Sequence, residues 1–362
     1  MKILYAVQGT GQGHISRARA MAEALREWPV EVTWLFSGRP REALFDMEPF
    51  GHFAYRQGLS FTTRAGRLRY RATLRDNRLR QFVRDTRELD LRPYDLLVCD
   101  YEPVLAHAAR RQGRSLVGIG HQYAFGPHTP RAGESWLQEQ ILARFAPVNV
   151  PMGLHWHPYA DNVLPPILDL PDLPVSRGEH LLVYLPFEDQ DAVTAILRTF
   201  PRRRFVQYAP GLRDEECGNV ARRRADFKGF KLTLASCEGV ICNSGFELIS
   251  ECLQWRKPVL TKPLHGQMEQ HSNAMALEQL GYASVTQVFD APALADWLAD
   301  RHRTADIQFP AVAPALARWL ANGCAESPAA LARTLWRSAP SQRIPAPRPT
   351  SGRDLPAVAW GR

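Results

Sequence analysis

The chain has 362 residues, of which 45% are hydrophobic and 23% charged, and its formal net charge is +8. At about 150 residues per domain, this length predicts two domains with sizeable cores and excludes a chain that is disordered throughout. No run approaches the roughly 18 to 20 apolar residues of a membrane-spanning helix, and the first apolar run is too short for a signal peptide. We therefore expect a cytoplasmic protein.

The six cysteines indicate the redox state of the protein, and the basic charge indicates the class of partner that it binds. The cysteines form no Cys-x-x-Cys pair and no regular framework, which indicates reduced and mostly buried thiols. The positive charge comes mainly from arginine and is compatible with an anionic partner, namely a nucleotide, a nucleic acid or an acidic membrane surface. No nucleic-acid recognition motif accompanies it, so we do not expect nucleic acid to be the partner.

Strands and helices alternate in the first part of the chain. The predicted elements are, in order, a strand at 2–7, a glycine loop at 8–13, a helix at 14–28, strands at 31–36 and 96–99, a helix at 104–111 and a strand at 115–119. This βαβ pattern predicts a parallel sheet with helices on both faces.

Residues 62–92 are dense in arginine and carry interspersed apolar residues, so we expect helix over much of this segment. Its basic face is either a solvated helix surface or a surface that docks on an anionic membrane.

A second alternating half follows a proline-rich stretch that we interpret as an interdomain linker at 166–178. The predicted elements are strands at 181–185, 204–208, 239–242, 258–261 and 283–285, helices at 191–199, 230–235, 246–254 and 270–280, and two helical pieces within 291–339. The expected domains are 1–165 and 179–338, with a disordered tail at 339–362 that is rich in proline, serine, glycine and arginine.

The loop from Gly9 to His14 lies between a predicted strand and a helix. Its glycines, Gly11 and Gly13 among them, let the backbone approach a ligand, and the helix N-terminus offers free N–H groups. The spacing is Gly-x-Gly-x-Gly rather than the dinucleotide pattern, and no acidic residue ends the second strand. A purely structural turn remains possible, as does an NADP-dependent oxidoreductase in which Arg39 meets the phosphate.

His14 and Asp100 form a candidate catalytic pair. The positive helix end favours a neutral imidazole at His14, which is the form that takes a proton from a hydroxyl. Asp100 ends a predicted parallel strand, and such strand ends lie on the ligand side of a sheet. Its carboxylate is expected to hold the other imidazole nitrogen. The alternatives are a hydrogen-bonded structural histidine, and an aspartate that caps the following helix.

The C-terminal half carries the more specific pattern. A strand end, a small-residue turn and a helix span 242–251, a strand flanked by prolines follows, and then come Glu269-Gln270, Asn273 and Gly281. With the N-terminal glycine loop and histidine, this series resembles inverting two-Rossmann-domain (GT-B) glycosyltransferases of the family 28 and UDP-glycosyltransferase type. The resemblance covers most of residues 1–285.

The resemblance implies an α/β fold in which two Rossmann-like domains face each other across a cleft, with helices at the C-terminal end. The donor, a UDP-sugar, would bind the C-terminal domain. Ser244 and Gly245 would approach its diphosphate, Glu251 the ribose, and Glu269 and Gln270 the sugar. The implied donor site also includes Gly11, Gly13, Asn243, Phe246 and Asn273.

By the same resemblance, His14 is the general base and Asp100 orients it. The chain departs from the family at Asn243 and Ser244, where relatives often have His or Gly-Gly, and at Glu269, where related plant enzymes have Asp.

Other polar motifs are less specific. Asp189 and Asp191 match the Asp-x-Asp of metal-dependent transferases, yet they begin a predicted helix and are explained as a negative cap, so we expect no metal and no other cofactor. His155 and His157 share a strand face without a third zinc ligand. His121 and Gln122 follow a strand and either line an acceptor pocket or make structural hydrogen bonds.

Together with these patterns, the resemblance implies a metal-independent inverting glycosyltransferase that moves a sugar from a nucleotide-sugar to an acceptor hydroxyl. The acceptor is unknown, and a lipid-linked acceptor would suit docking on the inner face of a membrane. The alternatives are a sugar-nucleotide epimerase or hydrolase of the same fold, and a nucleotide-sugar-binding protein without catalysis.

Overall fold

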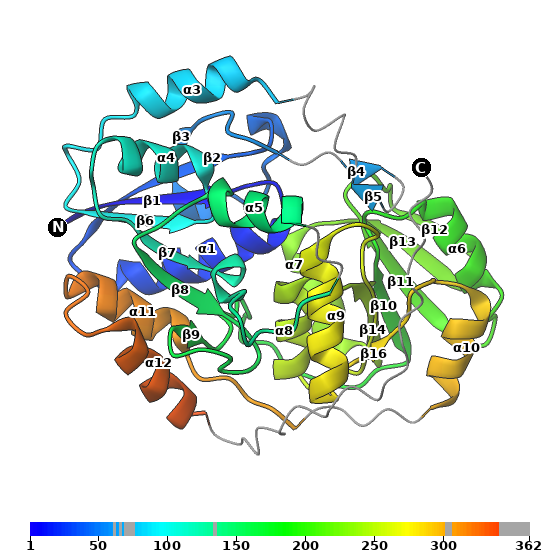
Figure 1. The fold of residues 1–362 in the computed structure, drawn as a ribbon. Helices are drawn as coiled ribbons and strands as arrows, with labels where there is room; N and C mark the ends of the chain where they lie inside the picture. The colour runs from blue at the N-terminus through cyan, green and yellow to red at the C-terminus, as the bar shows by residue number, and fades with distance from the viewer. Residues whose placement is uncertain (61–62, 65–66, 69–76, 133–135, 301–305, 340–362) are drawn as a thin grey trace.

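Two seven-stranded sheets, one in each half of the chain, organise the structure (Figure 1). The structure is a computed structural model that describes residues 1–60, 63–64, 67–68, 77–132, 136–300 and 306–339. Helices cover both faces of each sheet, and the two halves lie side by side. The predicted fold class, two Rossmann-like α/β domains of the GT-B type, is confirmed.

The N-terminal sheet is entirely parallel and has the order β3-β2-β1-β6-β7-β8-β9. Its strands are β1 (Lys2–Gln8), β2 (Glu31–Ser37), β3 (Ala54–Tyr55), β6 (Leu96–Asp100), β7 (Val117–Gly120), β8 (Val150–Leu154) and β9 (Val163–Leu164). The helical segments of this half are α1 (Gln12–Arg26), η1 (Arg41–Ala43), η2 (Glu48–Phe50), α3 (Leu79–Glu88), α4 (Pro103–Arg111), η3 (His121–Ala124) and α5 (Trp136–Phe145).

Strand β1 shows why helices lie on both faces. Side chains alternate between the faces of a strand, and all the interior positions of β1 are apolar. Ile3, Tyr5 and Val7 pack in the core that contains α1, whereas Leu4 and Ala6 pack in the core that contains α4. A strand that is apolar on both faces is buried on both.

The C-terminal sheet has the order β12-β13-β11-β10-β14-β15-β16 and is parallel except for the edge pair of β12 and β13. Its strands are β10 (His180–Tyr184), β11 (Arg204–Ala209), β12 (Glu215–Cys217), β13 (Val220–Arg224), β14 (Gly239–Asn243), β15 (Val259–Lys262) and β16 (Ser284–Val285). Its helices are α6 (Gln190–Arg198), α7 (Phe227–Ser236), α8 (Phe246–Gln254), α9 (Met268–Leu280) and α10 (Ala291–Ala299).

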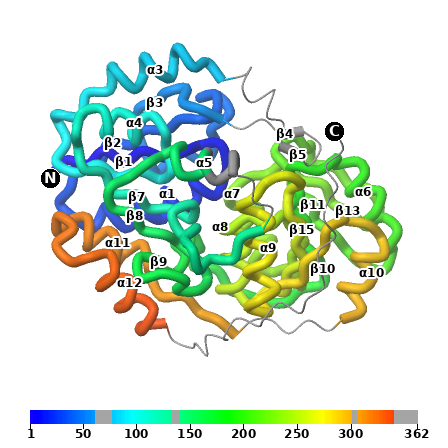
Figure 2. The backbone as a smooth tube through the Cα atoms, in the orientation of Figure 1, coloured from blue at the N-terminus to red at the C-terminus, as the bar shows by residue number. Residues whose placement is uncertain are grey.

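The last helices pack on the N-terminal half. Helix α11 (Val312–Ala321) contacts α1, and α12 (Pro328–Arg337) contacts β9, where Trp336 Nε1 donates a 2.7 Å hydrogen bond to the Val163 carbonyl. Figure 2 shows both at the edge of the N-terminal half, away from α10. The predicted domain range 179–338 assigned them to the C-terminal half. In the structure α11 packs against α1 and α12 against β9, which sequence order does not indicate.

Two other expectations differ from the structure. The helix expected over much of 62–92 is confined to α3 in the part that the structure describes, and β4 (Thr63–Arg64) and β5 (Arg67–Leu68) form an antiparallel pair before it. Within the described residues 291–300 and 306–339 the structure has three helices, α10, α11 and α12, where two were expected. Pro314 lies in the first turn of α11 and Pro328 is the first residue of α12, where a proline does not interrupt a helix.

The disordered tail predicted at 339–362 lies outside the described residues, apart from Ala339. Among the helices of the described part, none is both long and apolar enough to cross a membrane. All six cysteines are free.

Candidate active site

A cleft of about 520 Å³ lies where the carboxyl ends of both sheets meet. In an open parallel sheet, ligands bind where the strand order reverses, and these points fall between β1 and β6 and between β10 and β14. The loops after these strands line the cleft. They contribute Gly11, Gly13 and His14 after β1, Tyr101 after β6, Phe187 after β10, and Asn243, Gly245 and Phe246 at the end of β14 and after it.

The glycine loop joins β1 to α1 in one tight turn. Gly11 is the N-cap of α1 and makes no side-chain cap, so the first N–H groups of the helix are left for a ligand. Gly13 faces the other half of the molecule. A Cβ atom there would overlap the Glu247 carboxylate in its present position, so glycine leaves room for this contact between the halves.

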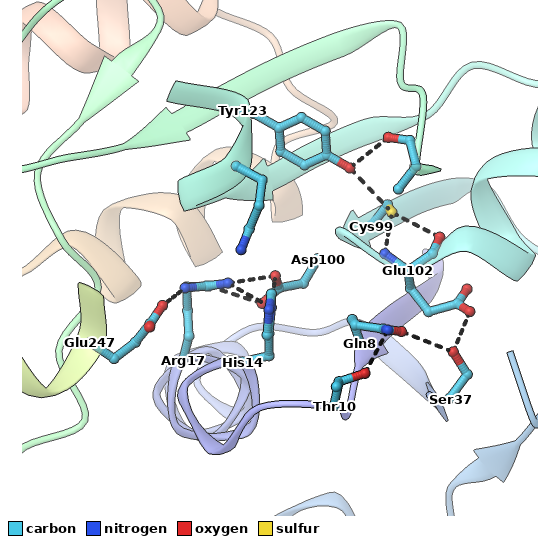
Figure 3. A network of polar contacts seen from close by, with 12 residues as sticks. Gln8, Thr10, His14, Arg17, Ser37, Cys99, Asp100, Glu102, Tyr123 and Glu247 are labelled. Atoms are coloured by element: carbon cyan, nitrogen blue, oxygen red, sulfur yellow. Dashed lines mark hydrogen bonds and ion pairs between the residues drawn. The ribbon is translucent and has the colours of Figure 1, made fainter. Parts of the chain in front are cut away.

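His14 and Asp100 meet as the sequence predicted. His14 Nδ1 lies 2.8 Å from Asp100 Oδ1 (Figure 3), and the His14 side chain is 15% exposed toward the cleft, whereas Asp100 is fully buried. Burial alone would raise the pKa of Asp100, but the charges of Arg17 and His14 hold it below its usual value. A carboxylate in this position keeps Nδ1 protonated and leaves Nε2 for the cleft.

Asp100 is not the cap of the following helix. That role belongs to Glu102, whose carboxylate accepts hydrogen bonds from the backbone N–H groups of Val104 and Leu105 at 2.9 and 2.7 Å. Between them, Tyr101 has a left-handed backbone with φ of 52°. A non-glycine residue in this conformation is strained. The backbone turn at Tyr101 lets the Asp100 side chain face His14 while the Glu102 side chain faces α4.

Arg17 is a site residue that our sequence reasoning missed. Its Nε and Nη2 donate to the two carboxylate oxygens of Asp100 at 2.9 and 2.6 Å, and its Nη1 pairs with Glu247 of α8. Its side chain is only 1% exposed. The sequence feature that could have identified Arg17 is the spacing His14-x-x-Arg17, because residues three apart lie on one face of a helix.

On the C-terminal side, the N-terminus of α8 faces the cleft. Gly245 is its N-cap without a side-chain cap, and nothing lies within 4 Å of a Cβ atom placed there. Glu269 and Gln270 also line the cleft; Glu269 accepts a 3.0 Å hydrogen bond from Gln122 Nε2, and Gln270 accepts one of 2.8 Å from the Leu264 N–H.

Three candidate donor residues are buried beneath this surface. Ser244 and Asn273 are fully buried; the Ser244 hydroxyl bonds to Thr261 at 2.9 Å, and Asn273 Nδ2 donates to the Ser244 carbonyl at 3.0 Å. Glu251 forms a buried ion pair with Lys231. Burial raises the pKa of Glu251 even though Lys231 opposes the shift. This pair lines a smaller pocket of about 100 Å³ that also borders Gln12, Gly13 and Glu247.

His121 does not line the cleft, whereas Gln122 does. The His121 ring stacks on Phe246 with centroids 4.1 Å apart, and its nitrogens lie 2.8 Å from the Leu154 carbonyl oxygen and 2.7 Å from Asn273 Oδ1. His121 therefore joins the two halves through structural contacts. Of the two interpretations offered for this residue, an acceptor pocket or structural hydrogen bonds, the second agrees with the structure.

The weaker motifs have structural partners. Asp189 caps α6 by accepting a 2.9 Å bond from the Ala192 N–H, and Asp191 pairs with Arg222. His155 is buried against Trp156 and Tyr159. In the described ranges, no cluster of three or more His, Cys, Asp or Glu side chains is arranged to hold a metal ion.

The chain matches the family described as glycosyl transferase family 1 over residues 1–300. The chain belongs to this family. The predicted glycosyltransferase class is confirmed, and this membership favours glycosyl transfer over the NADP reading. Arg39, which that reading required for a phosphate, donates to the Thr10 carbonyl at 2.8 Å.

Solved glycosyltransferase structures share the fold along nearly the whole chain. CalG4, the calicheamicin glycosyltransferase, is 16% identical with a TM-score of 0.54, and the match covers 93% of this chain and 97% of that one. LpCGTa in complex with UDP is 14% identical with a TM-score of 0.56 and the same coverage. SsfS6 from Streptomyces sp. SF2575, complexed with thymidine diphosphate, is 15% identical with a TM-score of 0.54, covering 93% and 100%. No curated protein sequence matches the chain.

Proposed function

We propose that this family member is an inverting glycosyltransferase that moves a sugar from a nucleoside diphosphate sugar to an acceptor hydroxyl. One observation carries the proposal: His14, held by the buried Asp100, shares a cleft with the uncapped N-terminus of α8. A base and an anion-binding helix end on facing walls are what a displacement at a sugar carbon requires.

In this mechanism His14 Nε2 takes the proton of the acceptor hydroxyl. The acceptor oxygen forms a bond to the anomeric carbon from the face opposite the nucleotide, and the bond from that carbon to the diphosphate oxygen breaks. The configuration is therefore inverted. The departing diphosphate gains negative charge, which the N–H groups at Gly245 and Phe246 stabilise electrostatically. Asp100 stabilises the imidazolium that forms.

The donor half of the cleft suits a uridine or thymidine diphosphate sugar. Glu269 and Gln270 present polar side chains to a sugar, and the smaller pocket with Glu251 and Lys231 adjoins the loop that would contact the phosphates. A carboxylate accepts hydrogen bonds from both ribose hydroxyls. The UDP complex of LpCGTa and the thymidine diphosphate complex of SsfS6 support these two nucleotides.

We further propose that the reaction needs no metal. Both carboxylates of the Asp-x-Asp motif have protein partners, since Asp189 caps α6 and Asp191 pairs with Arg222. In the proposed reaction, helix N–H groups stabilise the charge that a divalent ion stabilises in metal-dependent transferases. Transfer is expected to persist within about twofold after treatment with EDTA, because this electrostatic contribution of N–H groups stays in place. The measurement is release of nucleoside diphosphate from UDP-glucose or dTDP-glucose with 4-methylumbelliferone as acceptor. Loss of activity that Mg²⁺ or Mn²⁺ restores contradicts the proposal.

For the acceptor, we propose a lipid-linked molecule reached from the cytoplasmic face of an anionic membrane. Helix α3 exposes two apolar residues one turn apart, since Leu79 is 55% and Val83 43% exposed to solvent. The exposed residues around them include four arginines, namely Arg78, Arg80, Arg84 and Arg87. Exposed apolar residues flanked by basic ones are typical of a helix lying at a lipid surface.

His14→Ala is expected to lower transfer by about 100- to 10,000-fold, because the general base is lost, while UDP binding stays unchanged. The same release assay and calorimetry with UDP measure the two effects. His52→Ala, at an exposed loop histidine, is the matched control and retains the parent rate. Transfer by His14→Ala within threefold of the parent would refute the assignment. Nucleotide release at equal rate without acceptor would instead indicate a hydrolase.

Glu251→Gln is expected to weaken UDP binding by about 1.5 to 3 kcal/mol, since a charged acceptor for the ribose hydroxyls is removed. Glutamine is preferred to alanine because it keeps a hydrogen-bond partner for the buried Lys231. Calorimetry measures the affinity. Glu238→Gln, which removes a surface carboxylate paired with Arg203 in the same half, is the control. Equal affinities for both variants and the parent would assign Glu251 a structural role only.

Vesicle co-sedimentation tests the membrane proposal. The chain is expected to sediment with phosphatidylglycerol-containing vesicles at low salt and less at high salt, because each basic residue contributes about 1 kcal/mol that salt screens. Arg80→Glu with Arg84→Glu should release it, whereas Arg110→Glu with Arg111→Glu on α4 should not. Equal sedimentation with neutral vesicles, or none with either, argues for a soluble acceptor.

A further inference from the structure

Arg17 lies between a carboxylate from each half of the molecule. Asp100 of β6 receives two hydrogen bonds from its guanidinium, and Glu247 of α8 pairs with the remaining terminal nitrogen (Figure 3). Arg17 Nη2 also lies 3.0 Å from His14 Nδ1. Four groups thus form a continuous chain from the catalytic histidine in one half to an acidic residue in the other.

The charges in this chain are linked to the protonation of His14. With a neutral imidazole, Asp100, Arg17 and Glu247 carry a net charge of −1, and a proton on His14 brings the cluster to zero. Without Glu247, Asp100 and Arg17 already cancel, so an imidazolium would leave an uncompensated positive charge. In a buried site such a charge is strongly disfavoured. The charge of an imidazolium at His14 is therefore balanced only when Glu247 is paired with Arg17.

Three other titratable side chains beside the cluster, those of Tyr5, Cys99 and His121, are neutral near pH 7. Burial raises the pKa of Tyr5 on β1 and of Cys99 on β6 far above neutrality. Burial also lowers the pKa of His121 on η3, which senses the charge of Arg17. Glu269 of α9 is the next carboxylate along the cleft and bonds to Gln122. The charged groups linked to His14 by direct contacts are thus Arg17, Asp100 and Glu247, while Glu269 adds a negative charge farther along the same cleft.

We propose that Glu247 and Arg17 are positioning residues that couple contact between the two halves to the basicity of His14. The inference rests on the proposed role of His14 as general base. When α8 lies against α1, Glu247 neutralises Arg17 and Asp100 is free to stabilise an imidazolium. When the halves separate, Arg17 instead cancels Asp100 and the base is weakened. Gly13 leaves room for this contact, because a Cβ atom there would overlap the Glu247 carboxylate in its present position.

If the Arg17–Glu247 ion pair only held the two halves together, removing either charge would not shift the ionisation of His14 in a defined direction. The proposed coupling predicts such shifts. Glu247→Gln removes a negative charge and should move the pH midpoint of His14 ionisation to lower pH by about half a unit, while Arg17→Met removes a positive charge and should move it to higher pH by about one unit. Ring-proton NMR of the full chain with UDP present measures the midpoint, with the His14 signal assigned by its loss in His14→Gln.

Two matched variants control for general effects of charge and burial. Glu188→Gln removes a carboxylate of similar exposure that pairs with Lys262, and Arg19→Met removes the other buried arginine of α1, which bonds to Asp169. Their partners lie away from His14 and Asp100, since Glu188 pairs with Lys262 and Arg19 bonds to Asp169 and Ser16. Neither variant should move the midpoint by more than about 0.2.

Opposite shifts in Glu247→Gln and Arg17→Met support the inference, whereas shifts in one direction, or shifts no larger than in the controls, overturn it. If Arg17→Met does not fold, Glu247→Gln against Glu188→Gln decides the question alone. The NMR titration needs no acceptor, so it also separates the two proposals. Absence of sugar transfer by the parent chain would refute the proposed function, and an unshifted midpoint would refute the coupling.

Discussion

A buried arginine links the two halves of this glycosyltransferase. Arg17 comes from the first helix of the chain, yet it is paired with carboxylates that follow about 80 and 230 residues later. A buried guanidinium is tolerated only when its donors are matched, so removing either carboxylate leaves a charge that burial penalises. The contact between the halves and the geometry of His14 therefore depend on the same side chain.

The position of the cleft follows from parallel sheet topology. Each sheet reverses its strand order beside its first strand, and the loops that leave the strands at that point open a crevice. The two crevices face each other, which brings the loop after β1 opposite the start of α8. Short, small-residue turns at Gly11 and Gly245 leave helix N–H groups uncovered on both walls. A single arrangement thus supplies the proposed base, the proposed anion site and the space between them.

Packing behind the cleft holds the two halves together. One apolar core includes residues from both sheets and from α11, which returns to cover α1. Polar contacts cross the same boundary: His121 stacks on Phe246, and Trp156 Nε1 donates a 2.8 Å bond to the Ser250 hydroxyl. Ser244 and Asn273 belong to this supporting layer, since their side chains orient the loop before α8 from beneath instead of lining the cleft.

The sequence by itself determined the periodic elements, the two-sheet architecture and the pairing of His14 with Asp100, because strand alternation and the common direction of parallel strand ends are local rules that sequence records. It also placed α8 at its observed bounds, since Gly245 precedes a clear helical period. The long-range contacts became known only from the folded structure. Arg17 and Glu247 meet across the whole chain, Glu251 turns to Lys231, and α11 crosses to the other half. Such contacts depend on which buried charges and apolar faces come together in space, and no spacing along the chain encodes them.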